Sequence, residues 1–203
     1  MDTTTRRRAI LGGLAIATAS ISIAVSTASA GATRPLARTT LLDTAGTVVG
    51  EVVFMGRGDD VSRVEVNIQA SAAPGLGDFH GFHVHTTGVC TPTPSGTTNV
   101  PFGSAGGHWN PTAASHGSHT GDLPSVLVRA NGQARQEFET DRFSVTELLD
   151  DDGSAVILHA GRDNFANIPA VYSSDGVPGP NATTLSTGDA GSRYACGVVQ
   201  LAS

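Results

Sequence analysis

VSRVEVNIQA, residues 61–70, alternates between apolar and polar side chains. Val64, Val66, Ile68 and Ala70 would share one face, while the intervening Arg, Glu, Asn and Gln side chains would share the other. A period of two with one apolar face predicts a half-buried antiparallel strand. We therefore start from an all-β fold and look for partner strands.

Seven further short runs are typical of strands, and Gly- and Asp-containing turns such as Asn131-Gly132 separate neighbours. They are Thr39 to Asp43, Val48 to Arg57, Phe79 to Thr86, Ser125 to Ala130, Ala134 to Thr140, Ala155 to His159 and Tyr194 to Leu201. Eight short strands predict a β-sandwich or barrel. Ser144 to Leu149 is the one predicted helical turn, with Glu147 three residues after a capping Ser144.

Two long segments interrupt this rhythm. Thr87 to Pro124 and Ala160 to Arg193 are rich in Gly, Pro, Ser, Thr and Asn. Loops of this length inside one domain are usually functional or disordered. Most of the seven histidines lie in or beside the first segment, which favours function.

The first 30 residues are interpreted as a signal peptide. Arg6, Arg7 and Arg8 precede an apolar stretch that ends in Ala28-Ser29-Ala30, and the paired arginines favour twin-arginine export. An uncleaved anchor is the alternative, but polar residues interrupt a stretch already short for spanning a membrane. Residues 31–38 would form a flexible mature N-terminus and 39–203 the domain, exported to a periplasm, cell-wall space or the exterior.

The charge of the chain excludes several partners. Without the three arginines and one aspartate of the leader, the 12 basic and 18 acidic residues give a net charge of −8, and there is no lysine. Nucleic acid and anionic membranes are poor partners for such a domain.

Cys90 and Cys196 are the two cysteines of the chain. An exported protein meets an oxidising compartment, which predicts one disulfide between them. Two buried free thiols are the alternative.

The histidines form groups with metal-ligand spacing. His83 and His85 flank Val84 on a predicted strand, where we expect them to reach one metal only if the strand end is distorted; exposed polar residues are the alternative. Downstream, His108, His116, His119 and Asp122 fall within fifteen residues, a set that suits tetrahedral zinc, although a solvated His-rich loop would have the same composition.

His159 ends an otherwise apolar predicted strand. A lone histidine there is more often a core residue than a ligand. Together with His83 and His85, however, it supplies the nitrogen-rich set that copper(II) prefers.

The ordered motifs of the chain resemble the copper/zinc superoxide dismutase family of the bacterial exported type. They are Gly81-Phe82-His83-Val84-His85, Gly107-His108-Trp109-Asn110-Pro111, His116-Gly117, His119-Thr120-Gly121-Asp122, His159 and Gly188 to Gly197, and they span nearly all of the mature chain. The resemblance implies an eight-stranded Greek-key sandwich or barrel with two long functional loops. It also implies disproportionation of superoxide by alternating reduction and reoxidation of a histidine-bound copper, with a structural zinc.

The resemblance assigns roles by position. Copper would be bound by His83, His85, His108 and His159, and zinc by His108, His116, His119 and Asp122, so that His108 bridges both ions. Asp163 would link a copper histidine to a zinc histidine, and Arg193 would hold the superoxide anion beside copper, positioned by the Cys90–Cys196 disulfide. Thr187 would narrow the channel, Ser186 stands where many relatives have lysine, and His80 would be structural.

Three alternative functions could use these same residues. A copper-delivery or other non-catalytic copper-binding domain would usually lack part of the copper set, and a copper-only enzyme would lose zinc ligands. A zinc hydrolase would need a general base beside an open zinc site. The sequence leaves open whether the protein is a monomer or a homodimer.

Overall fold

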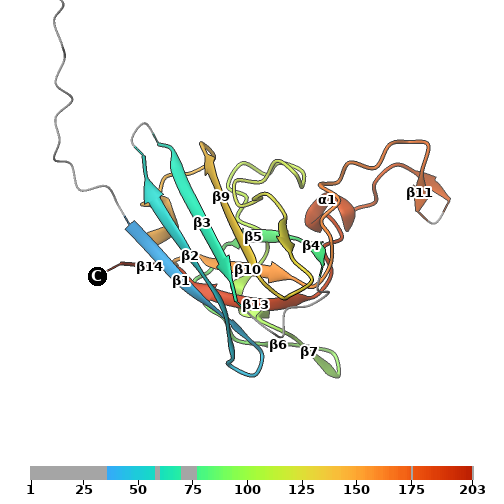
Figure 1. The fold of residues 1–203 in the computed structure, drawn as a ribbon. Helices are drawn as coiled ribbons and strands as arrows, with labels where there is room; N and C mark the ends of the chain where they lie inside the picture. Colours follow the sequence, from blue (N-terminus) through green and yellow to red (C-terminus); the bar gives the residue numbers. More distant parts are fainter. Residues whose placement is uncertain (1–35, 58–59, 70–76, 175, 203) are drawn as a thin grey trace, which may run out of the picture. The chain divides into compact units, whose positions relative to one another are not determined.

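The computed structural model describes residues 36–57, 60–69, 77–174 and 176–202. The predicted signal peptide lies outside these residues. Figure 1 shows an all-β arrangement, which confirms the predicted fold class. The main strands are β1 (Leu36–Asp43), β2 (Val48–Gly56), β3 (Ser62–Ile68), β5 (Phe82–His85), β9 (Ala134–Thr140), β10 (Ala155–His159), β13 (Arg193–Val198) and β14 (Gln200–Leu201).

These eight strands form one antiparallel sheet. Its order is β5-β10-β13-β1-β2-β3-β9, and β14 also pairs with β1. Strand β9 lies at one edge and β10 next to the other, so residues 141–154 cross between them, as in a Greek key. A separate ribbon pairs β4 (Asp78–His80) with β8 (Val126–Val128).

The alternation at residues 61–70 places β3 as predicted. Val64, Val66 and Ile68 are at most 1% exposed, whereas Arg63, Glu65 and Asn67 alternate with them on the outer face. The main core also includes buried side chains from β1, β2, β5 and β10, such as Leu41, Val52, Phe54, Phe82, Val84, Val156 and Leu158. One apolar face therefore folds the sheet around a single main core.

Strand β10 is covered on both faces. Val156 and Leu158 pack in the main core, while Ala155 and Ile157 pack in a second cluster with Phe102, Ala105 and Cys196. This second cluster lies beneath the first long loop. The strand that carries His159 is thus fixed from both sides.

Several element boundaries differ from the prediction. The predicted strand from Phe79 to Thr86 is divided at Gly81, where the backbone pairs instead with Gly161 and His159. Strand β1 begins at Leu36 rather than Thr39, so residues 36–38 are not part of a flexible N-terminus: Ala37 is fully buried and pairs with both Phe54 and Leu201.

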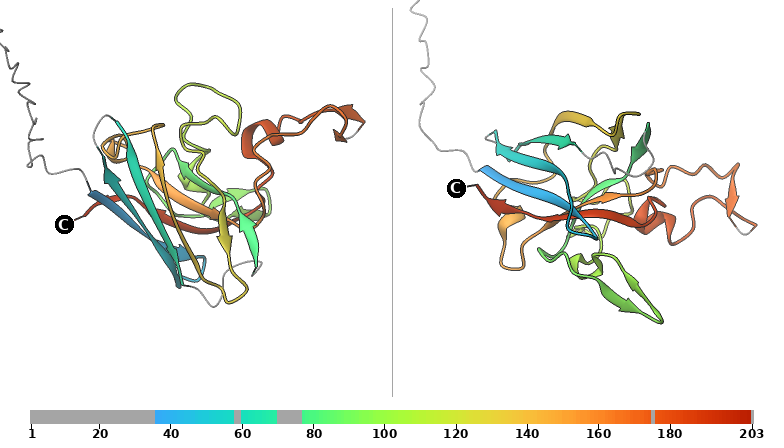
Figure 2. Two further views of the ribbon diagram at one scale, coloured as in Figure 1. Left: turned by 45° about the horizontal axis from the view of Figure 1, so that its top comes forward. Right: turned by 60° about the horizontal axis from the view of Figure 1, so that its bottom comes forward.

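The two long loops contain short elements of their own. The first holds the hairpin β6 (Thr93–Ser95) and β7 (Thr98–Val100) and the 3-10 helix η1 (Gly103–Ala105). The second holds β11 (Ser173–Ser174), β12 (Val177–Pro178) and α1 (Thr184–Thr187), and Figure 2 shows both hairpins outside the main sheet. The predicted helical turn is present as the 3-10 helix η2 (Glu147–Leu149), with Ser144 bonded to Glu147. Within the described residues, no helix has the length and hydropathy to cross a membrane.

Candidate metal centre

The outer edge of β5 receives the first long loop. The Val84 amide donates to the Gly121 carbonyl at 2.8 Å, and the Trp109 amide donates to the Val84 carbonyl at 2.9 Å. These contacts place His108 beside His85 and Asp122 beside His83. A Cβ on Gly121 would collide with the Val84 carbonyl, so only glycine allows the loop to approach this closely.

His83 and His85 reach one point from a regular strand. Both pair in register with β10, opposite Ile157 and Ala155. Residues two apart on a strand share a face, so the expectation that the strand end must be distorted was wrong.

A first cluster consists of His83, His85, His108 and His159, which are all buried and offer ring nitrogens within 4.8 Å of one another. Three of these nitrogens, His83 Nδ1, His85 Nε2 and His159 Nε2, are buried without a hydrogen-bond partner among the described residues. Their opposite ring nitrogens are occupied. His85 Nδ1 lies 3.0 Å from the Gly106 carbonyl oxygen and His159 Nδ1 3.2 Å from that of Gly191.

Buried polar atoms normally have partners, so three orphaned imidazole nitrogens facing one another require an explanation. A metal ion at their centre supplies it. Each imidazole would donate its occupied N–H to oxygen and present its lone pair to the ion, the usual arrangement of a ligating histidine. A purely nitrogen donor set suits copper.

A second cluster gathers around Asp122. Its Oδ1 lies 3.1 Å from His108 Nδ1, 3.3 Å from His116 Nδ1 and 3.2 Å from His119 Nδ1, and the Nδ1 atoms of His108 and His116 are 3.2 Å apart. Four donors about 2.0 Å from a tetrahedral zinc ion would stand about 3.3 Å from one another. These four distances therefore fit a tetrahedral zinc site.

His83 also comes within 4.8 Å of His108, His116 and Asp122. Its Nε2 is held by Asp163, and its orphaned Nδ1 belongs to the first cluster. His119, whose Nδ1 approaches Asp122, is the better fourth donor for the second cluster.

Asp163 connects the clusters. One carboxylate oxygen lies 2.7 Å from His83 Nε2 and the other 2.8 Å from His116 Nε2. Both imidazoles thereby point their Nδ1 atoms toward the metal positions. Gly188, at φ +61°, packs directly on Asp163 and His116, where a Cβ would collide with both.

The protonation states of His83 and His159 suit metal binding, whereas His116 would have to release a proton to a bound ion. Burial lowers the pKa of His83 to about 4 and that of His159 to about 3, so both are neutral at pH 7 with lone pairs available. Burial alone would lower the pKa of His116, but Asp122 and Asp163 outweigh it and raise the value to about 9. Burial alone would raise the pKa values of Asp122 and Asp163, and hydrogen bonds from the histidines hold both below the usual range.

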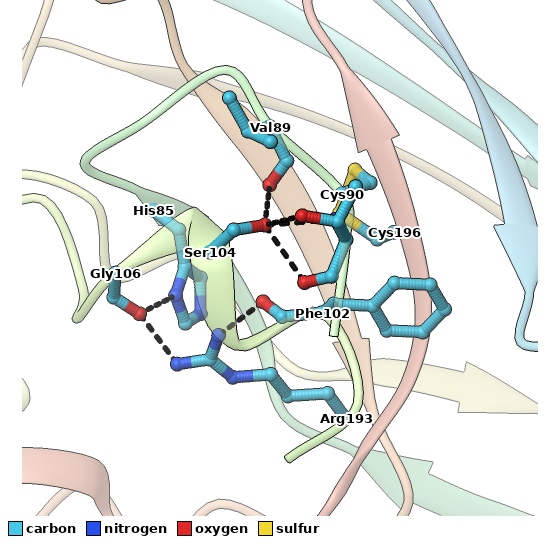
Figure 3. Close-up of a disulfide and its surroundings, with 9 residues drawn as sticks. His85, Val89, Cys90, Phe102, Ser104, Gly106, Arg193 and Cys196 are labelled. Atoms are coloured by element: carbon cyan, nitrogen blue, oxygen red, sulfur yellow. Dashed lines mark hydrogen bonds between the residues drawn. A yellow bond between two sulfur atoms is a disulfide. The ribbon is translucent and has the colours of Figure 1, made fainter. Parts of the chain in front are cut away.

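A cavity of about 550 Å³ opens beside the first cluster. His85, His108 and His159 line it together with Thr187, Ser186, Asp189 and Arg193. Arg193 Nη1 donates to the Phe102 carbonyl at 2.5 Å, and Nη2 donates to that of Gly106 (Figure 3). A fixed cation therefore stands where a small anion would approach the cluster.

The predicted disulfide between Cys90 and Cys196 is confirmed, with an S–S distance of 2.00 Å. It joins the first long loop to β13, the strand that begins at Arg193. His80 is 1% exposed, and its Nδ1 lies 3.1 Å from the His159 carbonyl oxygen. Arg162 is exposed and forms an ion pair with Asp78.

Sequence reasoning missed several contributors. The Gly106 and Gly191 carbonyls orient His85 and His159, but a backbone oxygen carries no residue-type signal. Arg142, which follows β9, donates to the carbonyls of His119 at 2.7 Å and Gly117 at 3.0 Å. Nothing in the sequence around Arg142 distinguishes it from an exposed turn arginine.

Comparison with known proteins gives consistent matches. The family model described as copper/zinc superoxide dismutase (SODC) matches residues 48–199. The superoxide dismutase (Cu-Zn) of Mycobacterium tuberculosis is 46% identical over 126 residues, which cover 60% of this chain and 52% of that protein, about half its length. That of Mycolicibacterium paratuberculosis is 41% identical over 160 residues, 76% of this chain and 69% of that protein. Among solved structures, the Cu/Zn superoxide dismutase from Brucella abortus has a TM-score of 0.60 and 27% identity, covering 81% of this chain and 99% of that one.

Proposed function

Because the chain belongs to the copper/zinc superoxide dismutase family, we propose that it disproportionates superoxide. Two superoxide anions and two protons give one dioxygen and one hydrogen peroxide. The observation that carries the proposal is the convergence of three orphaned, buried imidazole nitrogens with His108, which also belongs to the second cluster. A copper-delivery domain would not need this complete, shared set.

His83, His85, His108 and His159 would hold copper, and His108, His116, His119 and Asp122 would hold zinc. Bound copper supplies a one-electron couple that superoxide can both reduce and reoxidise, while zinc supplies order and positive charge. His108 offers Nδ1 to the second cluster, which leaves Nε2 for the first.

The protein's own groups bind the anion and move a proton. Arg193 would bind superoxide through charge-assisted hydrogen bonds at the cavity wall. His108 Nε2 would hold one of the two protons that peroxide needs and release it to the bound anion, and water in the cavity would give the other. The Gly106, Gly191 and Asp163 oxygens would keep the remaining imidazoles in the required tautomers.

The decisive experiment is metal analysis of the purified protein together with a superoxide-decay assay before and after chelation. We expect about one copper and one zinc per chain, with activity lost on chelation and regained with copper plus zinc. Replacing His159 by Ala should abolish activity, whereas replacing His80 by Gln should retain it. Unchanged decay after complete copper removal would contradict the proposal.

We further propose that residues 1–30 direct export and are removed, so that the enzyme acts outside the cytoplasm. The Cys90–Cys196 disulfide supports this because such bonds persist in oxidising compartments. Mass spectrometry of the protein from the producing cell would test it: a mature chain that starts at Gly31 is expected, and full-length cytoplasmic protein would refute export.

A further inference from the structure

The two residues that flank the short helix η1 hold the Arg193 guanidinium through their carbonyl oxygens. Phe102 precedes η1 at φ 53° and Gly106 follows it at φ 77°, and both turn their carbonyls to the Arg193 guanidinium. Left-handed backbone is costly for phenylalanine and persists only when its surroundings enforce it. The Gly106 carbonyl also accepts from His85 Nδ1, so η1 orients both the arginine and a candidate copper ligand.

Ser104, in the middle of η1, ties this helix to the segment around Cys90. Its hydroxyl accepts from the Thr91 amide at 2.7 Å and from Thr91 Oγ1 at 2.9 Å. It faces the carbonyls of Thr91 at 2.7 Å and Val89 at 3.1 Å, and its single proton can go to one of them at a time. Figure 3 shows Ser104 between Val89 and the Phe102 and Gly106 carbonyls that hold Arg193.

The contacts form a continuous chain that starts at Arg193 on β13 and returns to β13 at Cys196. Arg193 is bonded to the ends of η1, Ser104 links η1 to Val89 and Thr91, and Cys90 between them is joined to Cys196 on β13. The disulfide alone fixes the Cys90 segment to β13. The Ser104 hydroxyl carries that restraint onward to η1, assisted by the Ser104 amide, which donates to the Thr91 carbonyl at 3.1 Å.

We propose that Ser104 is a positioning residue that holds the Arg193 guanidinium and the His85 imidazole in their anion-binding and metal-binding orientations. The proposal rests on the proposed function, because it takes Arg193 to be the anion-binding group. Ser104 touches neither the anion nor a metal. It acts through the Phe102 and Gly106 carbonyls.

The test measures anion binding and side-chain order separately from catalysis. Azide, a small anion, is titrated into the copper- and zinc-loaded protein and followed by copper charge-transfer absorption. Nitrogen NMR of the metal-free protein reports the Arg193 guanidinium and the His85 tautomer without any metal. The variants are Ser104→Ala, the hydroxyl-retaining Ser104→Thr, and Ser95→Ala as an exposed serine of the same loop.

Loss of the hydroxyl removes hydrogen bonds that are each worth a few-fold in an equilibrium constant, so Ser104→Ala should weaken azide binding about three- to tenfold. The Arg193 and His85 signals should broaden or shift in the same variant. Ser104→Thr should bind azide within about twofold of the wild type, and Ser95→Ala should be unchanged. A core variant, Leu148→Ala, should lose stability without losing azide affinity, which separates positioning from general destabilisation.

Unchanged azide affinity and unchanged Arg193 and His85 signals in Ser104→Ala would overturn the proposal. If that variant does not fold, Thr91→Val replaces it, since this change removes one hydroxyl partner and keeps the backbone contacts; a smaller loss in the same direction is expected. Absence of superoxide disproportionation in the wild type would refute the proposed function. The NMR result on the metal-free protein would still decide the role of Ser104.

Discussion

At the scale of single residues, Asp163 links a histidine of the first cluster to a histidine of the second. It accepts from His83 with one oxygen and from His116 with the other, and both contacts are fully buried. A carboxylate can serve both N–H groups because each of its oxygens is an acceptor. No amide or hydroxyl of similar size could do this.

Replacing Asp163 by Asn should therefore release one imidazole. The amide retains one acceptor oxygen, but its NH₂ group would face the other N–H. Loss of such a partner weakens metal binding about 10- to 100-fold, and zinc retention measured by competition with a chromogenic chelator should fall by that factor. Asp78→Asn, which alters an exposed ion pair with Arg162, is the matched control and should retain zinc. Equal zinc retention in the two variants would exclude the linking role of Asp163.

At the scale of elements, Arg142 fastens the zinc-side loop to the connection after β9. Its guanidinium reaches the carbonyls of His119 and Gly117 on either side of Ser118. The contact joins a loop to a segment that the loop does not otherwise pair with in the main sheet. Arg142 thus limits the motion of one donor of the second cluster.

We predict that Arg142→Ala accelerates zinc loss several-fold, because hydrogen bonds to a charged donor contribute about 1.5–3 kcal/mol. Stopped-flow chelation would measure it. Arg129→Ala, which removes contacts to Gln133 within one turn, should leave the rate unchanged. A zinc-release rate that responds equally to both substitutions would contradict the assignment.

The disulfide acts between elements 106 residues apart in sequence. In the chain-entropy model a loop of this size stabilises the fold by about 4–5 kcal/mol. The Cys90→Ser/Cys196→Ser variant should lose up to that free energy of unfolding in urea titrations. The wild type under reducing conditions should show a comparable loss, and a reduced protein as stable as the oxidised one would refute the estimate.

At the scale of the whole molecule, the net negative charge would repel the proposed anionic substrate. Residues 31–203 carry a net charge of −8 and contain no lysine, and Ser186 rather than a cation lines the cavity next to Thr187. Among the described residues that line this cavity, Arg193 is the only arginine or lysine. Long-range attraction of superoxide should therefore be weak.

Arg193→Ala should lower kcat/KM at least about tenfold. It should also make the rate rise with ionic strength, because the remaining field repels the anion and added salt screens that repulsion. Arg162→Ala should change the rate less, since Arg162 is already paired with Asp78. Stopped-flow decay of superoxide across a salt series would show this. A rate indifferent to salt in the wild type and to both substitutions would refute electrostatic steering.

The sequence predicted more of the fold than of the backbone contacts that orient the metal-site histidines. The alternation at residues 61–70 identified β3, and the resemblance of the ordered motifs to a known family indicated which histidines converge in the first cluster. The break at Gly81 was missed because Phe79 to Thr86 contains no proline or turn cluster. The hairpins β6–β7 and β11–β12 have mostly polar, exposed residues without alternation, so no pattern announced them. The carbonyl partners of His85 and His159 depend on backbone geometry alone.

One consequence follows from how the loop lies along β5. The Val84 backbone pairs with Gly121 and Trp109, so the metal-bearing loop also covers the outermost rim of the sheet. An exposed edge strand presents unpaired backbone N–H and C=O groups that can pair with strands of other molecules. In metal-free protein, a loop that is no longer ordered by bound ions would leave the edge of β5 exposed to pairing with other copies of the chain. The supply of metal would then control how readily the protein aggregates.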